Sequence, residues 1–277
     1  MLILAAIPLG NPADASTRLK STIASVKFIA AEDSRRFGRL CADLGITYTA
    51  KLISFFEGNE LERLDELIAI LMSGEDLLVV TDAGMPGISD PGYRLARAAV
   101  ERNIPITVLP GPSAVTTALV LSGLPSDRFS FEGFPPRTSG ARVTWFQSLA
   151  EEERTFIFFE APHRLLESLE DAVSAIGGDR KAAICREMTK TYEETIRGTL
   201  SELHTWAQER EILGEITVVV EGFDPTSREF SEADLVAKVL AMEAAGIIRK
   251  DAIVEVAKEL GLPKRSVFDA MVHHKSR

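Results

Sequence analysis

Three segments of the chain combine glycine, proline and polar residues in a way that suits the binding of a small polar ligand. They are 8–14 (PLGNPAD), 82–92 (DAGMPGISDPG) and 110–114 (PGPSA). Glycine lets backbone amides approach a ligand closely, and proline stiffens the loop that carries them. Such loops suit a ligand with an amino-acid head and a nucleoside, held by backbone groups and one or two carboxylates. A tight turn is the simpler explanation of any one loop, but not of three loops that meet at one edge of a sheet.

The chain lacks the motifs of several common enzyme classes. It has no GxxxxGK[ST] loop for nucleotide triphosphates, no HExxH and no GxSxG. The GxGxxG loop of dinucleotide-binding domains does not follow the first predicted strand. The two cysteines, Cys41 and Cys185, have no CxxC partner, so neither a disulfide framework nor a thiolate metal site is indicated. No bound metal is expected, and this cysteine usage fits a reducing cytoplasm.

The three loops must be positioned by the short apolar runs that precede them. We predict strands at 2–7, 27–31, 52–56, 77–81 and 104–109. Helical patterns separate these strands, and the clearest runs from Asn59 to Gly74. Its predicted apolar face comprises Leu61, Leu64, Leu67, Ile68 and Leu71. Apolar strands that alternate with amphipathic helices indicate a parallel sheet covered on both faces, with its ligand crevice at the carboxyl ends of the strands.

A second α/β set follows the first. Its predicted strands are 129–134, 155–161, 181–187 and 216–221, with a helix at 163–176. The polar segment 224–230 predicts a linker into three short helices. Ser231 with Asp234 resembles a capping box for the first of these, and Gly261 with Pro263 separates the last two. The predicted units are an N-terminal α/β domain (1–112), a C-terminal α/β domain (113–224) and a helical unit (225–277).

The charge of the chain is uneven. The formal net charge of its 277 residues is -10, which argues against a protein that simply coats nucleic acid. From Gly246 to Arg277, however, the sequence has seven basic and four acidic residues, so this tail has a formal charge of +3. A basic tail is compatible with RNA binding, but charge alone favours a solvated helical face. No apolar stretch reaches the roughly 20 residues that a membrane span needs.

Taken in order, the motifs resemble those of the tetrapyrrole-methylase superfamily, and more narrowly those of its bacterial 16S rRNA cytidine 2'-O-methyltransferase branch. They are Pro8-Leu9-Gly10-Asn11, Glu32-Asp33-Ser34-Arg35, the loops 82–92 and 110–114, Glu132-Gly133-Phe134, Phe159-Glu160-Ala161-Pro162-His163-Arg164, Arg186-Glu187-Met188-Thr189-Lys190 and Gly214-Glu215-Ile216-Thr217. The SDPG and PGPSA pair separates this branch from the cobalamin and siroheme methylases. The departures are Leu9 where isoleucine is commoner, and DAGM where a Gly-Thr-Pro run is common.

The resemblance implies the fold and the activity. The fold is of the α/β class, with two α/β domains, a parallel N-terminal sheet, a mixed C-terminal sheet, a cofactor cleft between them and a small all-α C-terminal unit. S-adenosyl-L-methionine is the implied cofactor, and the chain is expected to form a homodimer. The implied activity is 2'-O-methylation of a cytidine ribose in the decoding region of 16S rRNA. The implied partner is 16S rRNA or the small ribosomal subunit, in the cytoplasm and without a membrane.

The resemblance also suggests roles for individual residues. Cofactor contacts are expected from Pro8, Leu9, Gly10, Asp82, Ala83, Gly84, Met85, Ile88, Ser113, Ala114, Phe159, Glu215 and Thr217. Substrate contacts are expected from Arg35, Arg36, Arg164 and Arg186. Because the acceptor hydroxyl is a poor nucleophile, a residue should help to remove its proton. The candidates are Glu32, Asp33, Glu160 and Lys190.

Other interpretations stay open. Asp33 also suits the N-cap of a helix, and Arg186 with Lys190 also suits a purely structural ion-pair cluster. A tetrapyrrole C-methyltransferase would share the cleft but need no basic tail, and a non-catalytic RNA-binding factor would need no ligand-lining loops. If the tail does not hold RNA, recognition falls to the rim of the cleft. The rim arginines are Arg35, Arg36, Arg137 and Arg142.

Overall fold

The N-terminal half of the chain folds around a five-stranded parallel sheet. The computed structural model describes residues 1–225 and 231–275. The strands are β1 (Leu2–Ala5), β2 (Phe28–Ala31), β3 (Lys51–Ser54), β4 (Leu77–Val80) and β5 (Ile106–Leu109), in the order β3-β2-β4-β1-β5. All neighbouring pairs run parallel, so every carboxyl end lies at one edge of the sheet. The predicted strands and their parallel arrangement are confirmed.

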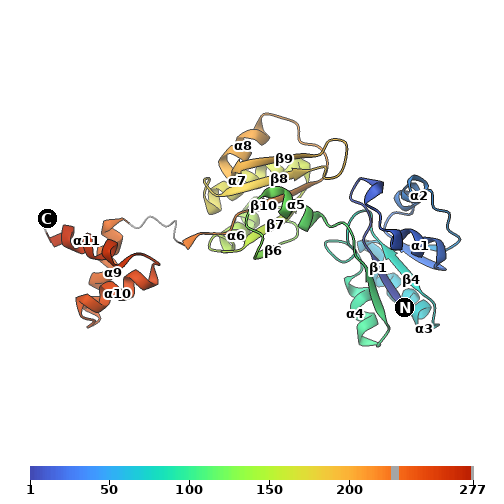
Figure 1. Ribbon diagram of the computed structural model, residues 1–277, viewed down its shortest axis with the longest axis horizontal. Helices are drawn as coiled ribbons and strands as arrows, with labels where there is room; N and C mark the ends of the chain where they lie inside the picture. The colour runs from blue at the N-terminus through green and yellow to red at the C-terminus, as the bar shows by residue number, and fades with distance from the viewer. Residues whose placement is uncertain (226–230, 276–277) are drawn as a thin grey trace.

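Helices cover both faces of this sheet, as the near-continuous apolar strands predict (Figure 1). The helices are α1 (Thr17–Ser25), α2 (Ser34–Asp43), α3 (Glu60–Met72) and α4 (Tyr93–Glu101). Strand residues such as Ile29 and Leu78 pack with α1 and α2, whereas Ala30 and Val79 pack with α3 and α4. Successive residues of each strand therefore serve opposite cores, which explains why the strands carry no polar alternation.

One residue of the predicted apolar face of α3 was wrong. Leu67, Ile68 and Leu71 are buried, but Leu61 is 66% exposed. Glu60 is buried in its place, because its Oε1 accepts hydrogen bonds from the backbone N–H groups of Gly92 (3.0 Å) and Arg94 (3.3 Å). One residue further along a helix turns about 100° away, so an inward Glu60 leaves Leu61 facing outward.

The second domain holds a mixed five-stranded sheet. Its strands are β6 (Phe129–Phe131), β7 (Thr155–Glu160), β8 (Lys181–Arg186), β9 (Glu194–Thr199) and β10 (Ile216–Val220), in the order β6-β7-β10-β8-β9. The β6–β7 pair is parallel and the others are antiparallel, as the family resemblance implies. Strand β9 was not predicted, because its sequence ETIRGT is half-buried and has no apolar run. It lies at the edge of the sheet, where burial demands little of the sequence.

Four helices flank the second sheet. They are α5 (Ala114–Ser122), α6 (Ser139–Ser148), α7 (Leu165–Ile176) and α8 (Leu200–Gln208). Helix α5 packs on one face, where Leu119 meets Ile157 and Val219. The other three share a core on the opposite face that contains Phe146 and Leu169. Because α5 follows the loop 110–114 directly, that loop joins the carboxyl edge of the first sheet to the second domain.

The last three helices form a unit with its own core. They are α9 (Glu232–Ala244), α10 (Arg249–Glu259) and α11 (Lys264–Lys275), and they lie away from both sheets in Figure 1. The Ser231–Asp234 capping box is present, and Gly261 and Pro263 lie between α10 and α11 as predicted. Most of the predicted linker, 226–230, is outside the described residues. No helix in the described part of the chain is long and apolar enough to cross a membrane.

Candidate active site

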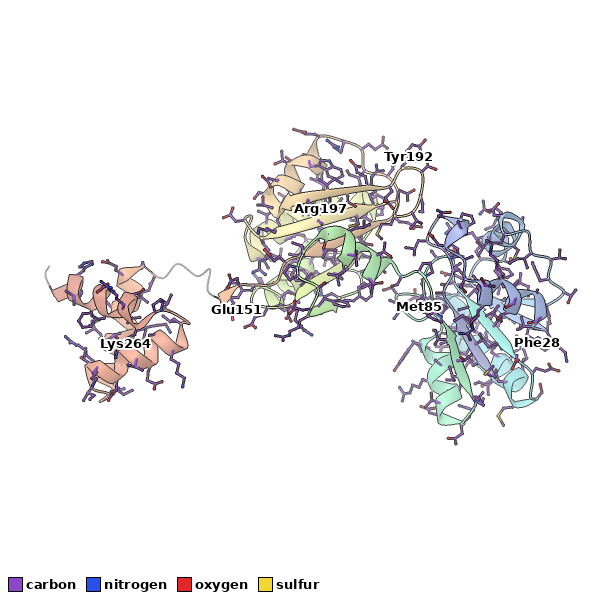
Figure 2. All side chains as sticks on the ribbon, in the orientation of Figure 1. Phe28, Met85, Glu151, Tyr192, Arg197 and Lys264 are labelled. Carbon is purple, nitrogen blue, oxygen red and sulfur yellow. The ribbon has the colours of Figure 1, made fainter. Side chains whose placement is uncertain are left out.

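A cavity of about 400 Å³ lies between the two α/β domains. Figure 2 shows Met85, one of its lining residues, on the side of the first domain that faces the second. The first domain contributes the ends of β1, β2 and β4, and the second contributes the end of β7 and the start of β10. The lining residues are Leu9, Glu32, Arg36, Asp82, Ala83, Gly84, Met85, Ile88, Ser89, Asp90, Ser113, Ala114, Val115, Phe134, Phe159, Glu160, Ala161, Pro162, Met188, Gly214, Glu215, Ile216 and Thr217.

The cavity gathers most of the residues predicted to contact the cofactor. All of them line it except Pro8 and Gly10, which belong to the same loop as the lining residue Leu9. Of the four predicted proton acceptors, Glu32 and Glu160 line the cavity, whereas Asp33 and Lys190 do not. Of the four predicted substrate arginines only Arg36 does. The loops therefore meet as the parallel sheet predicts. Of the predicted proton acceptors and substrate arginines, some line the cavity and the others lie outside its lining.

The loop 82–92 is fixed at several points. Gly84 exchanges two backbone hydrogen bonds with Ile7, at 2.9 and 3.2 Å, and its φ of 73° is one that glycine adopts without strain. Gly87 N–H donates to the carbonyl of Pro91 (3.1 Å), and Gly92 N–H donates to Glu60. Ser89 is held at a φ of 59°, which is unusual for a residue with a side chain. The loop therefore presents its side chains to the cavity from a defined backbone.

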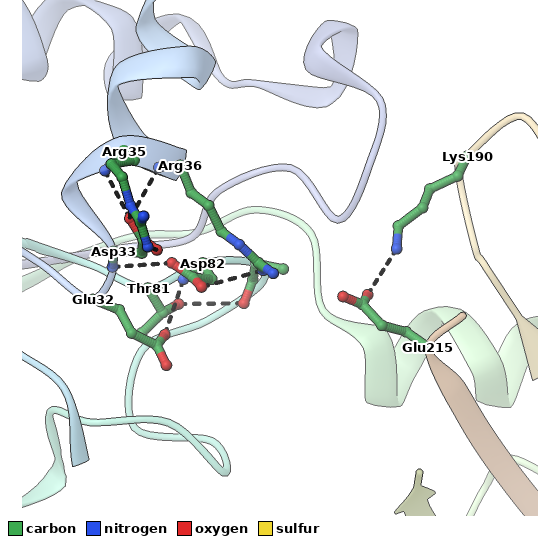
Figure 3. Close-up of polar contacts among 9 residues, drawn as sticks. Glu32, Asp33, Arg35, Arg36, Thr81, Asp82, Lys190 and Glu215 are labelled. Atoms are coloured by element: carbon green, nitrogen blue, oxygen red, sulfur yellow. Dashed lines mark hydrogen bonds and ion pairs between the residues drawn. The ribbon is translucent and has the colours of Figure 1, made fainter. Parts of the chain in front are cut away.

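Acidic residues at the ends of β2 and β4 form a network (Figure 3). Asp82 accepts a hydrogen bond from the backbone N–H of Asp33 (3.1 Å) and pairs with the Arg36 guanidinium at 3.2 Å. The backbone N–H of Asp82 donates to Oε2 of Glu32 (3.0 Å). Burial raises the pKa of Glu32, and the negative charge of Asp82 adds to this effect. These contacts bring two carboxylates to the cavity wall side by side.

Asp33 is the N-cap of a helix, which was the alternative interpretation of this residue. Its Oδ1 accepts from the backbone N–H groups of Arg35 (2.7 Å) and Arg36 (3.3 Å), so it is the N-cap of α2. The side chain of Arg35 also pairs with it at 3.2 Å. These hydrogen bonds hold the pKa of Asp33 at about 2. A carboxylate this acidic is a weak proton acceptor at neutral pH.

Glu160 lines the cavity with its side chain fully buried and its oxygens occupied. Its Oε1 pairs with Arg164 at 2.7 Å and accepts from the N–H of Ala161 (2.7 Å). Its Oε2 accepts a hydrogen bond from the Ser168 hydroxyl. Since a buried carboxylate is stable when paired and hydrogen-bonded, this arrangement favours a structural role for Glu160 as the anchor of Arg164.

Lys190 lies beside the cavity and supports its rim. Its Nζ pairs with Oε1 of Glu187 (2.8 Å) and with Oε2 of Glu215 (3.0 Å), and Glu215 lines the cavity. Burial lowers the pKa of Lys190, but the hydrogen bonds to the two carboxylates outweigh it, and the net shift is upward. Lys190 is therefore a cation at neutral pH. Arg186 is held nearby by Glu194 at 3.0 Å and by the carbonyl of Leu213.

One predicted member of the RNA-binding rim is not at the surface. The side chain of Arg142 is 1% exposed and donates to Asp171 (2.6 Å), which joins α6 to α7. The expectation that Arg142 lies on the exposed rim of the cleft was wrong, because a sequence does not show which charged residue finds a buried partner. Arg137 is exposed as expected.

Several lining residues were not assigned a role from sequence, although their motifs were noted. Asp90 belongs to the SDPG run, and Phe134 and Met188 lie in motifs of the second domain. Asp90 could have been found as an acid in a glycine-rich loop that follows a strand. Within the described part of the chain, no group of three or more His, Cys, Asp or Glu side chains is arranged to hold a metal ion.

Comparison with known proteins identifies the family. Residues 1–204 match the family model for Tetrapyrrole (Corrin/Porphyrin) Methylases. The chain belongs to this methylase family. The expected resemblance is thereby confirmed, and S-adenosylmethionine is the methyl donor of this methylase.

Relatives of this tetrapyrrole methylase are similar over almost its whole length. "Ribosomal RNA small subunit methyltransferase I" of Mycobacterium tuberculosis is 50% identical over 272 residues, which cover 98% of this chain and 94% of that protein. The protein of the same name from Synechocystis is 41% identical over 269 residues, with 97% and 96% covered. These likenesses agree with the ribosomal RNA branch that the motifs indicate.

Solved structures of low identity share the fold. Uroporphyrin-III-C-methyltransferase from Thermus thermophilus matches with a TM-score of 0.54 and 18% identity, covering 79% of this chain and 93% of its own. The methyltransferase CobJ matches with a TM-score of 0.61 and 15% identity, covering 83% and 96%. The two-domain α/β architecture is therefore that of the methylase family.

The cavity of this methylase fits S-adenosylmethionine. Its volume is within the range of about 300 to 1,000 Å³ that small-molecule sites have. Apolar side chains such as Leu9, Met85 and Phe159 offer a surface for the adenine ring, and carboxylates such as Asp82 suit the cationic groups and ribose hydroxyls. The predicted contacts of Pro8, Gly10 and the other loop residues stay predictions until a complex is measured.

Proposed function

We propose that this methylase transfers a methyl group to the 2'-hydroxyl of a cytidine ribose in the decoding region of 16S rRNA. The observation that carries the proposal is how far along the chain each kind of relative matches. The family model stops at residue 204, and the tetrapyrrole methylase structures cover 79 to 83% of the chain. The relatives named as ribosomal RNA methyltransferases match 97 to 98% of it, helical unit included.

Bound S-adenosylmethionine supplies an already activated methyl group, so the protein has to align the acceptor and exclude water. The fixed loop 82–92 and the network of Asp82, Glu32 and Arg36 provide a preorganised wall for this task. The side chain of Arg35 is 87% exposed next to the cavity, and we propose that it contacts an RNA phosphate. We propose Arg36, Arg164 and Arg186 as further substrate contacts, each oriented by the carboxylate it pairs with.

The contacts of the four candidates for proton removal differ. Asp33 is an N-cap with a pKa of about 2, Lys190 is a cation, and both oxygens of Glu160 are hydrogen-bonded. Glu32 has a raised pKa and one oxygen that accepts no hydrogen bond from a described residue, so it is the strongest proton acceptor of the four predicted residues.

The helical unit supports an RNA substrate. At the start of α11, Lys264 is exposed and the side chain of Arg265 is 91% exposed. Phe268, one turn further along, is 52% exposed. Cations beside an exposed aromatic ring suit phosphate contact and base stacking. We therefore propose that α11 contacts RNA outside the cavity.

Methyl transfer from labelled S-adenosylmethionine tests the proposal. The acceptors are small ribosomal subunits that lack the modification, free 16S rRNA, and a uroporphyrinogen. We expect label in the RNA of the first sample, recovered after nuclease digestion as 2'-O-methylcytidine by mass spectrometry. Label on a base, or on the porphyrinogen alone, contradicts the proposal. The homodimer and the cytoplasmic location stay predictions, to be tested by light scattering and by cell fractionation.

A further inference from the structure

One carboxylate in the wall of the cavity has no partner. Asp90 is half-buried and has no hydrogen bond or ion pair to any residue that the structure describes. The other carboxylates that line the cavity all have one. Glu32 accepts from a backbone N–H, Asp82 from another and from Arg36, Glu160 from three donors and Glu215 from Lys190. Among the lining acids, Asp90 is thus the one with both carboxylate oxygens available to a ligand.

The backbone holds Asp90 in this unpartnered position. Ser89, directly before it, has a φ of 59°, and Pro91, directly after it, accepts a hydrogen bond from Gly87 N–H at 3.1 Å. Gly92 then donates to the buried Glu60. A residue other than glycine in the left-handed region is retained when its surroundings over-determine it, often at a functional site. A constrained loop therefore holds the Asp90 carboxylate at the cavity, although this carboxylate would be better solvated in bulk water.

The charges that face Asp90 are mostly negative. Burial, together with the carboxylates of Glu32, Asp82 and Glu215, raises its pKa to about 7. The charged groups around it in the cavity wall are Glu32, Asp82, Arg36, Glu160 and Glu215. Arg36 pairs with Asp82, Arg164 with Glu160 and Lys190 with Glu215. A ligand that brings a positive charge into this setting favours the ionised form of Asp90.

We propose that Asp90 is the group that accepts the proton of the acceptor hydroxyl, and that the positive charge of the arriving methyl donor converts it to the carboxylate form. The inference rests on the proposed function, because it needs a hydroxyl acceptor. In the reaction, the O–H bond of the ribose breaks and its proton passes to Asp90. The oxygen forms the new C–O bond as the methyl carbon leaves its sulfur, which keeps the C–S electron pair. Asp90 later returns the proton to water.

Proton release on ligand binding tests the ionisation without any turnover. S-adenosylmethionine carries a positive sulfur, and S-adenosylhomocysteine, which differs from it only by loss of the transferred methyl group, has a neutral sulfur. Calorimetric titration at pH 7 in buffers of different ionisation enthalpy gives the number of protons released by each. We expect the cationic ligand to release roughly half a proton more per site, because a group with a pKa near 7 is about half protonated at that pH.

Two variants assign this proton. In Asp90→Asn the two ligands are expected to release the same number of protons, whereas Asp43→Asn, which removes an exposed carboxylate outside the cavity, should keep the difference. Equal release by the two ligands in the unaltered protein overturns the proposal. A difference that persists in Asp90→Asn overturns it as well.

The rate of the chemical step tests the second half of the proposal. Single-turnover transfer to small subunits, at saturating donor, is expected to fall about 100- to 10,000-fold in Asp90→Asn, the range that loss of a general base produces. The unaltered protein should show a rate that rises with pH through the ionisation of Asp90, and Asp43→Asn should share that profile. A rate or pH profile unchanged in Asp90→Asn overturns the assignment. If the unaltered protein transfers no methyl group to RNA, the proposed function fails, while the proton-release result is measured independently.

Discussion

The backbone N–H of Asn11, in the first domain, donates a hydrogen bond to the Thr189 hydroxyl of the second domain at 3.1 Å. Next to this contact, Gly10 lies so close to Lys190 that a Cβ on Gly10 would overlap the Cγ of the lysine. Lys190 also pairs with Glu215 at the cavity wall. The first glycine-rich loop therefore meets the Lys190 segment directly, and the two domains share a seam beside the cavity.

Gly10→Ala is expected to lower the free energy of unfolding by about 1 to 3 kcal/mol, the usual cost of overpacking a close contact. The added methyl group displaces Lys190 and weakens its ion pairs with Glu187 and Glu215. Urea unfolding measures the change. Gly38→Ala is the control, because no atom lies within 4 Å of the added Cβ in α2. If Gly10→Ala costs the same in a Lys190→Ala background, the clash with Lys190 is not its cause.

Asp82→Ala is expected to weaken S-adenosylmethionine binding by roughly 10- to 150-fold. Loss of a charge-assisted hydrogen bond costs about 1.5 to 3 kcal/mol, and each 1.4 kcal/mol is tenfold in affinity. Calorimetry measures the affinity, and circular dichroism checks that the variant is folded. Asp76→Ala is the matched control, since Asp76 directly precedes β4 at its opposite end and, among the residues that the structure describes, pairs with the N-terminal amine alone. Equal affinities for Asp82→Ala and Asp76→Ala would remove Asp82 from the site.

Asp90→Asn is expected to change how stability depends on pH. The pKa of Asp90 is about 7 in the folded protein and 3.8 as the ordinary value. Because the folded value is higher, the stabilising contribution of the protonated form is complete below about pH 4 and is lost as the pH rises to about 7. Asparagine has no such loss, so the variant should gain roughly 1 to 3 kcal/mol over the unaltered protein between pH 4 and pH 8, after allowance for solvent screening. Urea unfolding at both pH values measures this, and identical pH profiles would contradict it.

Truncation after Pro225 is expected to leave S-adenosylmethionine binding intact and to weaken RNA binding. The cut keeps Phe223, whose N–H donates to the carbonyl of Glu152 and whose ring lies under Arg180. Loss of two or three phosphate contacts should lower RNA affinity by roughly one to two orders of magnitude at moderate salt and flatten the salt dependence by about one unit per contact. Filter binding across a salt series measures both. An unchanged affinity and slope would leave the helical unit without a role in RNA binding.

Local patterns in the sequence determined most of the fold. Runs such as LLVV in β4 are apolar on both faces, which is typical of a parallel sheet covered by helices, and they predicted the strands of the first sheet. Parallel strands place all their carboxyl ends at one edge, so the convergence of the loops 8–14, 82–92 and 110–114 followed without any tertiary information. The edge strand β9 escaped prediction because a half-buried segment has weak periodicity. The exposure of Leu61 on α3 escaped it because the inward position of Glu60 depends on tertiary hydrogen bonds to Gly92 and Arg94.

The tertiary structure alone decided which charged side chains have partners. Arg142 is buried because Asp171, 29 residues away, is brought against it by the packing of α6 on α7. Glu160 is occupied by Arg164 and Ser168, whereas Asp90 faces the cavity without a partner in the described part of the chain. The sequence does not distinguish an acidic residue that is paired from one that is not. Its pKa and its availability to a ligand depend on burial and on charges a few ångströms away, and these distances exist only after the two domains have folded against each other.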